Sequence, residues 1–514
     1  MPRGRLAQLG AAAFGAALAA LGLPSLGLWA FAWLGFAPLI AGTNDSRSPA
    51  RSAVIGFAAG LAYNLVGLHW IFATCRFAQV PAAVSALALL ALASALSLSW
   101  GMSAALAPFV SAALPRVLRP LVWAAAWTAV ASAASLGTAR FGFDLLAYTQ
   151  WDNLGLLQGS AWGGPHLLDF TLILFNAALA EAWVDARAGE TKAGVPAMAA
   201  AIAVAGGIWA HGAATLAARP EDRGPAGRVE ILQPRVDQYH KFDERWISEV
   251  LAGYDELLAR PRAAAPLLVV WPETSIPRVS AIGVPIPEAA AWAVKLRAPQ
   301  LVGIIGSAPD GANSNAAQLI GADGKLAGFY AKRQLVPFGE FVPLRSWVPR
   351  YVIDRWLLIL DQLGDLEAGA PEQPLLETAW GPTAVTICYE AIFPRWPRFD
   401  AARGARLMIN ITNDAWYLDT WGPRQHYRIN RFRAIENRFA IIRAGNNGIS
   451  AVIDPWGVTT AELGLNERGR LDALVPLEDA FPGRSFYSRH GDWLGVMCIG
   501  LMLLALGFRI ARRP

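Results

Sequence analysis

The chain has 514 residues, of which 54% are hydrophobic and 16% are charged, and its mean hydropathy is +0.34. Average soluble chains carry roughly 25% charged residues, so this composition excludes a wholly soluble protein. The net charge of +5 and the pI near 9.2 do not indicate a nucleic-acid partner. Much of the basic excess lies in short loops and a tail, where positive charge sets membrane topology.

The N-terminal 218 residues have the pattern of a membrane region. They contain only seven of the 39 acidic residues, and a spanning helix needs about 20 mostly apolar residues. Apolar stretches lie near 6–22, 24–42, 52–74, 82–112, 118–136, 166–184, 195–217 and 492–509. We therefore expect a membrane domain of seven transmembrane helices over 1–218, and a C-terminal transmembrane helix with a basic cytoplasmic tail over 490–514. The first two stretches, which Pro24 separates, are also compatible with a signal peptide followed by one span.

Loop charges predict the orientation of these spans. With the N-terminus inside, the cytoplasmic loops and tail hold Arg47, Arg51, Arg116, Arg119, Arg187, Lys192, Arg509, Arg512 and Arg513. The opposite short loops hold Arg76 and Arg140. This asymmetry predicts eight spans with both termini in the cytoplasm, and it places residues 219–490 on the periplasmic side of a bacterial inner membrane.

From about residue 228 the pattern changes to that of an α/β domain. Short β-rich runs alternate with amphipathic stretches, which is typical of buried strands separated by helices. The predicted strands are 229–232, 267–271, 301–305, 384–387, 407–411, 440–443 and 449–453, and the predicted helices lie near 241–260, 286–297 and 423–439. We expect one domain over 228–478, which is long enough for a core of its own.

Two segments of this domain have no clean hydrophobic period. They are residues 341–360 and the aromatic cluster of Trp416, Tyr417 and Trp421. Ordinary packing is one interpretation. The other is a pair of loops that dip into the lipid interface, where aromatic and basic side chains collect. The basic stretch 423–443 predicts a surface that faces solvent or lipid headgroups.

Three reactive side chains each lie just past a β-like run. Glu273 follows the run 267–271, Lys332 precedes the segment Leu335-Val-Pro-Phe-Gly-Glu340, and Cys388 ends an apolar run that begins at Thr383. Only the thiolate of a cysteine is nucleophilic, so Cys388 needs a base, such as a partly buried glutamate, and a cation that also stabilises an oxyanion. Each residue alone is more often structural, but together they are the parts of an acyl-transfer site.

Neighbouring residues complete this predicted site. Glu340 is placed to position Lys332 or an incoming amine, and the backbone N–H of Tyr389 is the natural second donor to an oxyanion. Cys75 and Cys498 fall in or beside apolar spans and indicate no disulfide. The six histidines have no metal-ligand spacing, so we expect neither a metal nor a cofactor.

Seven sequence blocks, in order, resemble the nitrilase (carbon–nitrogen hydrolase) superfamily over about 228–478. The resemblance is closer still to its membrane branch, the bacterial apolipoprotein N-acyltransferases, and there it covers nearly the whole chain. The blocks are Trp271–Pro277, Tyr330–Pro343, Ile387–Glu390, Asn410–Trp416, Gly422–His426, Arg433–Glu436 and Asn446–Gly448. The resemblance implies a polytopic α-helical membrane domain joined to an α/β domain with the nitrilase αββα sandwich fold.

The resemblance also implies roles for individual residues. Glu273 matches the family's general base, Lys332 its oxyanion-stabilising lysine and Cys388 its nucleophile. Supporting positions match Glu340, Tyr389 and Glu390, of which the last two shape an acyl pocket or brace the loop. Two positions depart from the family pattern: Phe242 stands where a tryptophan is usual, and Tyr417-Leu418 follows Trp416 where an aromatic residue and glycine are usual.

The implied reaction is a two-step acyl transfer at the membrane. Cys388 attacks a phospholipid ester, usually of phosphatidylethanolamine, and forms a thioester. The α-amine of S-diacylglyceryl-cysteine at the N-terminus of an apolipoprotein then takes the acyl chain.

Two rival interpretations remain open from the sequence. One is a membrane-tethered amidase of the nitrilase type that hydrolyses a small substrate. The other is a transporter or structural membrane protein whose α/β domain is inactive.

Overall fold

The computed structural model describes residues 2–44, 46, 48–112, 114–136, 141–220, 226–343, 345–347, 364–476 and 483–511. They form two compact units. The helical unit consists of Met1–Phe72, Ala82–Arg219 and Ser485–Pro514, and the catalytic unit consists of Ala73–Pro81 and Pro220–Arg484. The chain therefore enters the catalytic unit twice, first through a short segment between two apolar helices.

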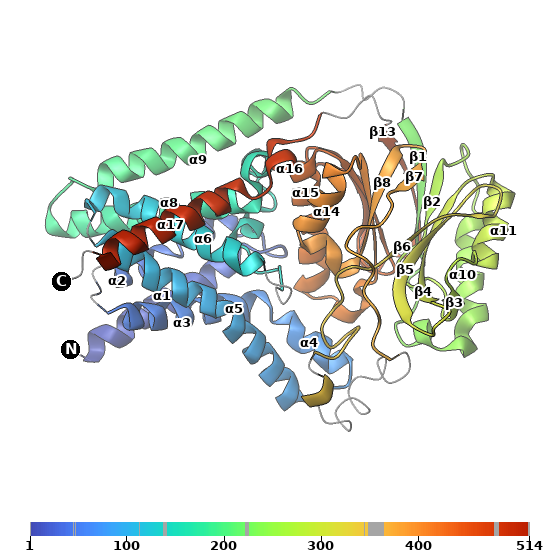
Figure 1. The fold of residues 1–514 in the computed structure, drawn as a ribbon, viewed down its shortest axis with the longest axis horizontal. Helices are drawn as coiled ribbons and strands as arrows, with labels where there is room; N and C mark the ends of the chain where they lie inside the picture. Colours follow the sequence, from blue (N-terminus) through green and yellow to red (C-terminus); the bar gives the residue numbers. More distant parts are fainter. Residues whose placement is uncertain are drawn as a thin grey trace. The chain divides into compact units, whose positions relative to one another are not determined.

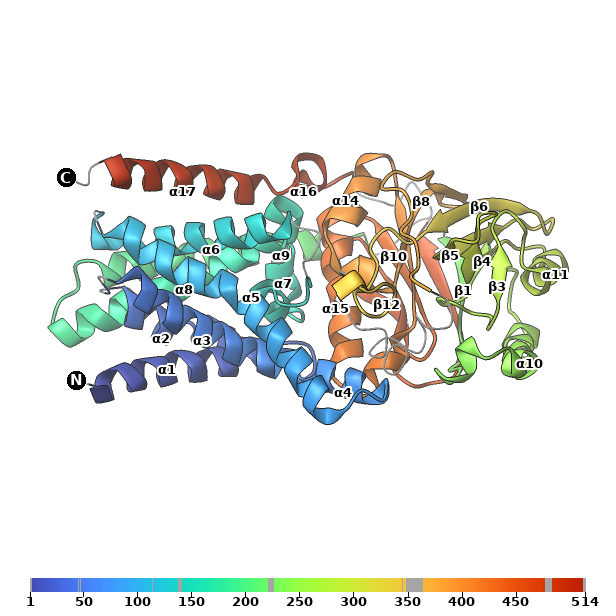
Figure 2. The same cartoon turned by 60° about the horizontal axis from the view of Figure 1, so that its bottom comes forward.

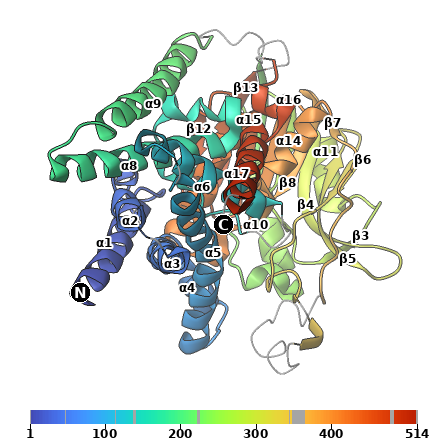
Figure 3. The ribbon, with the colours of Figure 1, turned by 60° about the vertical axis from the view of Figure 1, so that its left-hand side comes forward.

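The helical unit is built from antiparallel apolar helices that run side by side (Figure 2). Its helices are α1 (Pro2–Ala20), η1 (Trp29–Trp33), α2 (Ala37–Thr43), α3 (Pro49–Gly67), α5 (Ala82–Ser111), η2 (Arg116–Leu118), α6 (Arg119–Ser135), η3 (Leu146–Gln150), α7 (Leu154–Leu157), α8 (Ser160–Ala188), α9 (Gly194–Ala217), α16 (Phe486–His490) and α17 (Trp493–Ala511). Helix α4 (Trp70–Phe77) crosses the division between the two units. Helix α3 packs against α1 and α5, and α6 packs against α8 and α17 (Figure 3).

Five of these helices are long and apolar enough to cross a membrane, namely α5, α6, α8, α9 and α17. The pair α3 and α4 bends by 52° and adds a sixth if it is one span. The predicted span 24–42 is not one helix, because η1 and α2 occupy it as two short pieces. Within the described residues α1 does not pass the same test, so five or six helices meet it, and it does not confirm the predicted number of eight spans.

A buried ion cluster joins one end of this helix bundle. Arg116, at the start of η2, lies 2.9 Å from the Glu181 carboxylate and 2.8 Å from that of Asp185. Asp185 also accepts the backbone N–H groups of Ala193 and Gly194 at the start of α9. The start of α6, the end of α8 and the start of α9 therefore meet at one end, where several of the loop arginines lie.

The catalytic unit contains two β-sheets that pack face to face (Figure 1). The first sheet has the order β13-β1-β2-β4-β5-β6, with β3 paired to β4, and the second has the order β12-β11-β10-β9-β8-β7. The first comprises β1 (Ala226–Gln233), β2 (Leu268–Val270), β3 (Val279–Ala281), β4 (Gln300–Ser307), β5 (Asn313–Ile320), β6 (Leu326–Ala331) and β13 (Gly469–Pro476). The second comprises β7 (Leu376–Thr378), β8 (Gly381–Ile387), β9 (Leu407–Thr412), β10 (Ala440–Gly445), β11 (Ser450–Ile453) and β12 (Thr459–Leu463).

Helices cover the outer face of each sheet. Helices α10 (Ile247–Ala259) and α11 (Pro287–Leu296) pack on the first sheet. Helices α14 (Arg395–Ala402) and α15 (Trp421–Asn437) pack on the second. The shared core between the sheets is almost entirely aliphatic, with Val229, Val270, Leu301, Ile387, Ile409 and Ile442 among its buried side chains. The α/β prediction is confirmed as an αββα sandwich, and the parallel strands β8, β9 and β10 end at one edge.

All seven predicted strands are present, as β1, β2, β4, β8, β9, β10 and β11. The prediction for the basic stretch 423–443 is wrong, because α15 and β10 are mostly buried. Arg433 pairs with Glu436 at 2.6 Å and Arg443 pairs with Asp414 at 2.7 Å, all four side chains having no exposed surface. Most of the predicted lipid loop 341–360 lies outside the described residues, although Trp347 is 83% exposed.

Candidate active site

Glu273 lies on a rigid turn that follows β2. The preceding Trp271 is buried, stacks on Tyr254 and donates its indole N–H to Gln300 at 2.9 Å. Strand β4 passes so close to the turn that any side chain at Gly303 would overlap the Pro272 carbonyl. These contacts fix the backbone and aim the Glu273 side chain, which is 7% exposed, toward Asn315 near the start of β5.

Lys332 directly follows β6 and is almost fully buried. Its ammonium donates to Glu340 Oε1 at 2.8 Å and lies 3.6 Å from Glu273 Oε1. Burial by itself lowers the pKa of Lys332, but attraction to Glu340, Glu273 and Cys388 outweighs it and raises that pKa. Lys332 therefore keeps its positive charge throughout the ordinary pH range.

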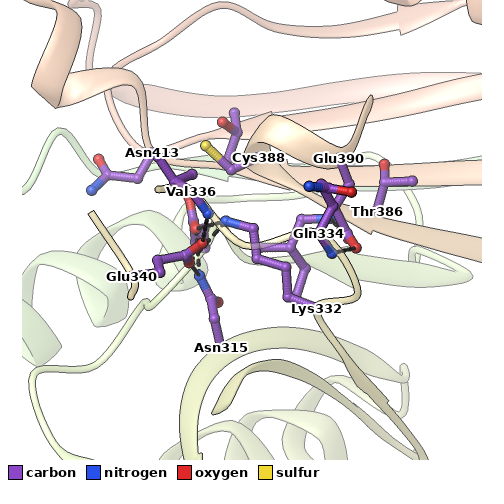
Figure 4. Close-up of polar contacts among 12 residues, drawn as sticks. Asn315, Lys332, Gln334, Val336, Glu340, Thr386, Cys388, Glu390 and Asn413 are labelled. Carbon is purple, nitrogen blue, oxygen red and sulfur yellow. Dashed lines mark hydrogen bonds and ion pairs between the residues drawn. The ribbon is translucent and has the colours of Figure 1, made fainter. Parts of the chain in front are cut away.

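Asn315 in β5 joins the two carboxylates. Its amide nitrogen donates to Glu273 Oε1 and to Glu340 Oε1, both at 2.7 Å, while Glu340 Oε2 accepts the backbone N–H of Val336 at 2.8 Å. We call Glu273, Asn315, Lys332 and Glu340 the carboxylate cluster (Figure 4). Sequence reasoning missed Asn315, because no strand was predicted there and Asn315 directly follows two other polar residues, Asn313 and Ser314.

Cys388 sits at the tight turn between β8 and η7 (Cys388–Ile392). Its backbone φ is +50°, which is uncommon for a residue with a side chain. Burial, together with the nearby Glu273 carboxylate, raises the pKa of the Cys388 thiol to about 12 against the opposing effect of Lys332. Figure 4 shows the Lys332 ammonium between Glu340 and Cys388, so the structure brings the three predicted catalytic residues together.

A buried polar network supports the Cys388 backbone from behind. The Cys388 carbonyl accepts a hydrogen bond from His426 Nε2 at 3.0 Å, and His426 Nδ1 lies 2.8 Å from Asp414. Burial by itself raises the pKa of Asp414, but Arg443 and His426 together lower it to about 2. Gly448 leaves room for this carboxylate, because a side chain there would overlap Asp414. Four of the sequence blocks therefore meet at the Cys388 turn.

Glu390 connects the Cys388 turn to the Lys332 segment. One of its oxygens accepts Ile387 N–H at 2.8 Å and Tyr330 O–H at 2.9 Å, and the other accepts Arg333 N–H at 2.5 Å. Arg333 in turn pairs with Asp400 at 2.6 Å. We call Tyr330, Arg333, Glu390 and Asp400 the brace. All four are buried, so the geometry of Glu390 fits bracing of the loop.

The remaining predicted residues lie around the site rather than in the carboxylate cluster. Tyr389 packs edge-on against Phe393 with ring centres 4.9 Å apart. Trp416, in η8 (Asp414–Tyr417), meets the Phe77 ring at 6.1 Å, and Phe77 belongs to the segment that re-enters the catalytic unit. Phe242 lies in η4 (His240–Phe242), and its side chain is outside the described residues.

A second lysine enters the site from the same short helix. Lys241 has no exposed surface, and its ammonium donates to the backbone carbonyl of Glu273 at 2.5 Å. Sequence reasoning noted the adjacent Phe242 and missed Lys241, because a single lysine normally indicates a solvated side chain. Throughout the part of the chain that the structure describes, no three His, Cys, Asp or Glu side chains group as a metal site.

Comparison with known proteins gives two family matches. Residues 15–178 match the "Apolipoprotein N-acyltransferase N-terminal domain" and residues 245–483 match "Carbon-nitrogen hydrolase". The apolipoprotein N-acyltransferase of Geobacter metallireducens is 31% identical over 96% of this chain and 94% of its own. That of Sinorhizobium medicae is 31% identical over 89% of this chain and 88% of its own. A solved carbon-nitrogen hydrolase from Helicobacter pylori G27 is 17% identical with a TM-score of 0.37, covering 50% of this chain and 92% of that one.

Proposed function

This chain belongs to the apolipoprotein N-acyltransferase family, and on that premise we propose that Cys388, Glu273 and Lys332 carry out its chemistry. The enzyme transfers a fatty acyl chain from a phospholipid, through a cysteine thioester, to the N-terminal α-amine of S-diacylglyceryl-cysteine in apolipoproteins. This transfer is the final step of bacterial lipoprotein maturation. The observation that carries the assignment is the position of Lys332, 2.8 Å from Glu340 and 3.6 Å from Glu273, within electrostatic reach of Cys388.

In the first step Cys388 becomes acylated. Glu273 takes the proton from the Cys388 sulfur, which counters the high pKa that burial gives the thiol. The thiolate attacks the ester carbonyl, and the Lys332 ammonium and the Tyr389 backbone N–H stabilise the oxyanion. When the intermediate collapses, the C–O bond of the ester breaks, and protonated Glu273 returns its proton to the departing alkoxide of the lysophospholipid.

In the second step the acyl chain moves to the acceptor amine. The amine attacks the thioester carbonyl, Glu273 accepts a proton from the nitrogen, and the C–S bond breaks to give an amide and the Cys388 thiolate. The same oxyanion donors serve both steps. Exclusion of water is essential, because water in the site would hydrolyse the thioester.

The supporting residues have separate proposed roles. Glu340 holds Lys332 charged and in place, and Glu390 fixes the Cys388 turn against the Lys332 segment. Tyr389, Trp416 and Phe242 line the path of the lipid chains. Phe242 and Tyr417-Leu418, where the chain departs from the usual family residues, are then positions that tune donor or acceptor preference.

We propose the eight-span topology with both termini in the cytoplasm and residues 228–478 as the periplasmic catalytic domain of an inner-membrane enzyme. The membrane parts are then residues 1–218, with seven spans, and 490–514. Two observations support this topology. The start of α1 and the end of α17 lie at the same end of the helix bundle in Figures 1 and 2. Arg116 and Arg119 begin η2 and α6, and Arg187 lies in the last turn of α8.

Phosphatidylethanolamine is the proposed acyl donor. The test is to incubate the detergent-purified enzyme with phosphatidylethanolamine vesicles and then measure intact mass and released lysophospholipid. We expect one acyl adduct on Cys388, none in Cys388→Ala, and an unchanged adduct in the matched control Cys498→Ala, which alters a buried cysteine of α17. Turnover by Cys388→Ala would exclude covalent catalysis, and release only from phosphatidylglycerol vesicles would exclude the proposed donor.

A further inference from the structure

Lys241 is a buried cation that the acyl-transfer mechanism above does not use. Its side chain has no exposed surface, and its ammonium donates to the Glu273 carbonyl at 2.5 Å. A lysine ammonium is strongly hydrated in water, and its transfer into a protein interior costs several kcal/mol unless anions compensate it. A buried lysine at this position therefore needs a compensating role or a compensating partner.

The segment that carries Lys241 is held firmly in place. Asn446 clamps the backbone of Val236 through two hydrogen bonds, of 3.0 and 2.8 Å. The N–H of Lys241 donates to the Asp237 carbonyl at 3.2 Å. Because Asn446 fixes the chain before the turn and the Lys241–Asp237 bond closes the turn itself, the backbone directs the Lys241 side chain to the Glu273 turn.

The anions that face Lys241 are those of the catalytic site. Glu273 and Cys388 both attract its positive charge. Glu273 is in turn a neighbour of Lys332, which pairs with Glu340. Before reaction, two carboxylates face one ammonium at Lys332, so the site has an excess negative charge unless Lys241 is protonated. With Lys241 charged, two anions balance two cations.

We propose that Lys241 is a positioning residue for acyl transfer, which keeps the buried site electrically neutral while the Cys388 proton moves to Glu273. This inference rests on the proposed function. During that step the S–H bond breaks and an O–H bond forms on Glu273, so the negative charge moves from the carboxylate to the sulfur. Lys241 faces both groups, so it stabilises the anion before and after the transfer, and its bond to the Glu273 carbonyl fixes the turn that receives the proton.

The proposal predicts a specific pH dependence. Burial lowers the pKa of Lys241 to about 8, against the opposing attraction of Glu273 and Cys388. Below this pKa the ammonium is charged and the site is balanced, and above it the site carries one uncompensated negative charge that opposes thiolate formation. The rate of Cys388 acylation should therefore fall as the pH rises through about 8. Lys332 stays charged across this range because its own pKa is raised.

The test measures single-turnover acylation of Cys388 by intact mass, with the full-length enzyme and phosphatidylethanolamine vesicles, from about pH 6 to pH 10. Three variants are compared with the wild type. Lys241→Met removes the charge with little change in volume, Lys241→Arg keeps a charge that does not titrate in this range, and Lys325→Met is the matched control at an exposed lysine. We expect Lys241→Met to slow acylation roughly 10- to 100-fold near neutral pH and to abolish the decline of the acylation rate at basic pH. Lys241→Arg should keep more activity than Lys241→Met, and its acylation rate should decline only at a higher pH than that of the wild type.

Several outcomes would overturn this role. They are a wild-type profile with no decline near pH 8, a Lys241→Met profile that keeps the decline, and a decline at the same pH in Lys241→Arg. The wild-type and arginine profiles decide the matter even if Lys241→Met fails to fold. Cys388→Ala separates the two levels of the argument: acylation of that variant would remove the proposed function itself, whereas a wild-type-like Lys241→Met beside an inactive Cys388→Ala removes only the role of Lys241.

Discussion

Lys332 and Arg333 are consecutive residues, yet they belong to two buried charge networks with different properties. In the carboxylate cluster, Lys332 shares its ammonium between two carboxylates at unequal distances, 2.8 Å to Glu340 and 3.6 Å to Glu273. In the brace, Arg333 binds both oxygens of Asp400, at 3.1 and 2.6 Å, and its backbone N–H donates to Glu390.

The difference lies in how completely each carboxylate is held. Burial raises the pKa of Glu390, but both of its oxygens accept hydrogen bonds from backbone and phenol donors, which stabilise the carboxylate. Glu273 is held through one oxygen by Asn315 and only loosely by Lys332. A catalytic base must gain and lose a proton, so incomplete compensation suits Glu273, whereas full compensation suits a structural carboxylate.

Replacement of Lys332 should have the largest effect on activity. In Lys332→Met we expect Cys388 acylation to slow by roughly 10²–10³-fold, because the oxyanion loses a charged donor. The thermal midpoint should change little, since the two carboxylates it leaves are slightly exposed and can share a proton. Single-turnover mass measurements and a thermal scan check this result. Near-normal acylation would show that Lys332 has a structural role like that of the brace residues.

Replacement of Arg333 should have the opposite result. Arg333→Met leaves buried Asp400 without its closest cation, with Arg403 remaining 3.8 Å away, which should reduce the free energy of unfolding by about 3–5 kcal/mol. The acylation rate per folded molecule should stay within a few-fold of the wild type. Denaturant unfolding in detergent measures the first quantity and burst amplitude normalises the second, while Arg333→Lys serves as the charge-preserving control. A stable but inactive Arg333→Met would contradict the comparison.

Glu340→Gln tests whether the Lys332 charge depends on its neighbour. Burial lowers the pKa of Lys332 and the two glutamates raise it, so loss of one glutamate lets that pKa fall. The ammonium is then lost at a lower pH than in the wild type. We expect roughly 10- to 100-fold slower acylation and a decline of the acylation rate that begins at a lower pH than in the wild type. An acylation profile that coincides with that of the wild type would exclude this dependence.

Among the residues of the carboxylate cluster, the smallest effect on acylation is expected for Asn315→Ala. This change removes two hydrogen bonds to charged groups, and each such bond contributes about 1.5–3 kcal/mol. Because the carboxylates can shift toward Lys332 in response, acylation should slow only about tenfold. An effect as large as that of Lys332→Met would place Asn315 on the reacting atoms, and the acylation rate constant of the two variants measured side by side distinguishes the cases.

Local patterns predicted the two kinds of structure in this chain correctly. Apolar stretches of membrane-spanning length and β-rich runs are local signals, so the long helices and seven strands followed from them. The stretch 24–42 was predicted as one spanning helix because it is apolar, but its backbone breaks between η1 and α2. Six of the described strands, β3, β5, β6, β7, β12 and β13, were not predicted, and Asn315 was missed together with β5.

The basic helix shows the limit of charge as a signal. The arginines in 423–443 predicted a solvated surface, yet Arg433 and Arg443 are buried with carboxylate partners. Asp414 lies 29 residues from Arg443 in the sequence, and the tertiary structure brings the two side chains together. The charge pattern of one segment does not predict whether an anion from a distant part of the chain will pack against it.

The sequence by itself determined the family, the α/β character of the domain and the three side chains proposed to be reactive, because motifs and hydrophobic periods are local properties. Only the tertiary structure decided which charges share a pocket. It separated Lys332 from Arg333, added Asn315, and brought Lys241 from a distant turn to the Glu273 backbone. The reason is physical: the protonation state and role of a buried group depend on neighbours within a few ångströms, and chain folding, not sequence distance, selects those neighbours.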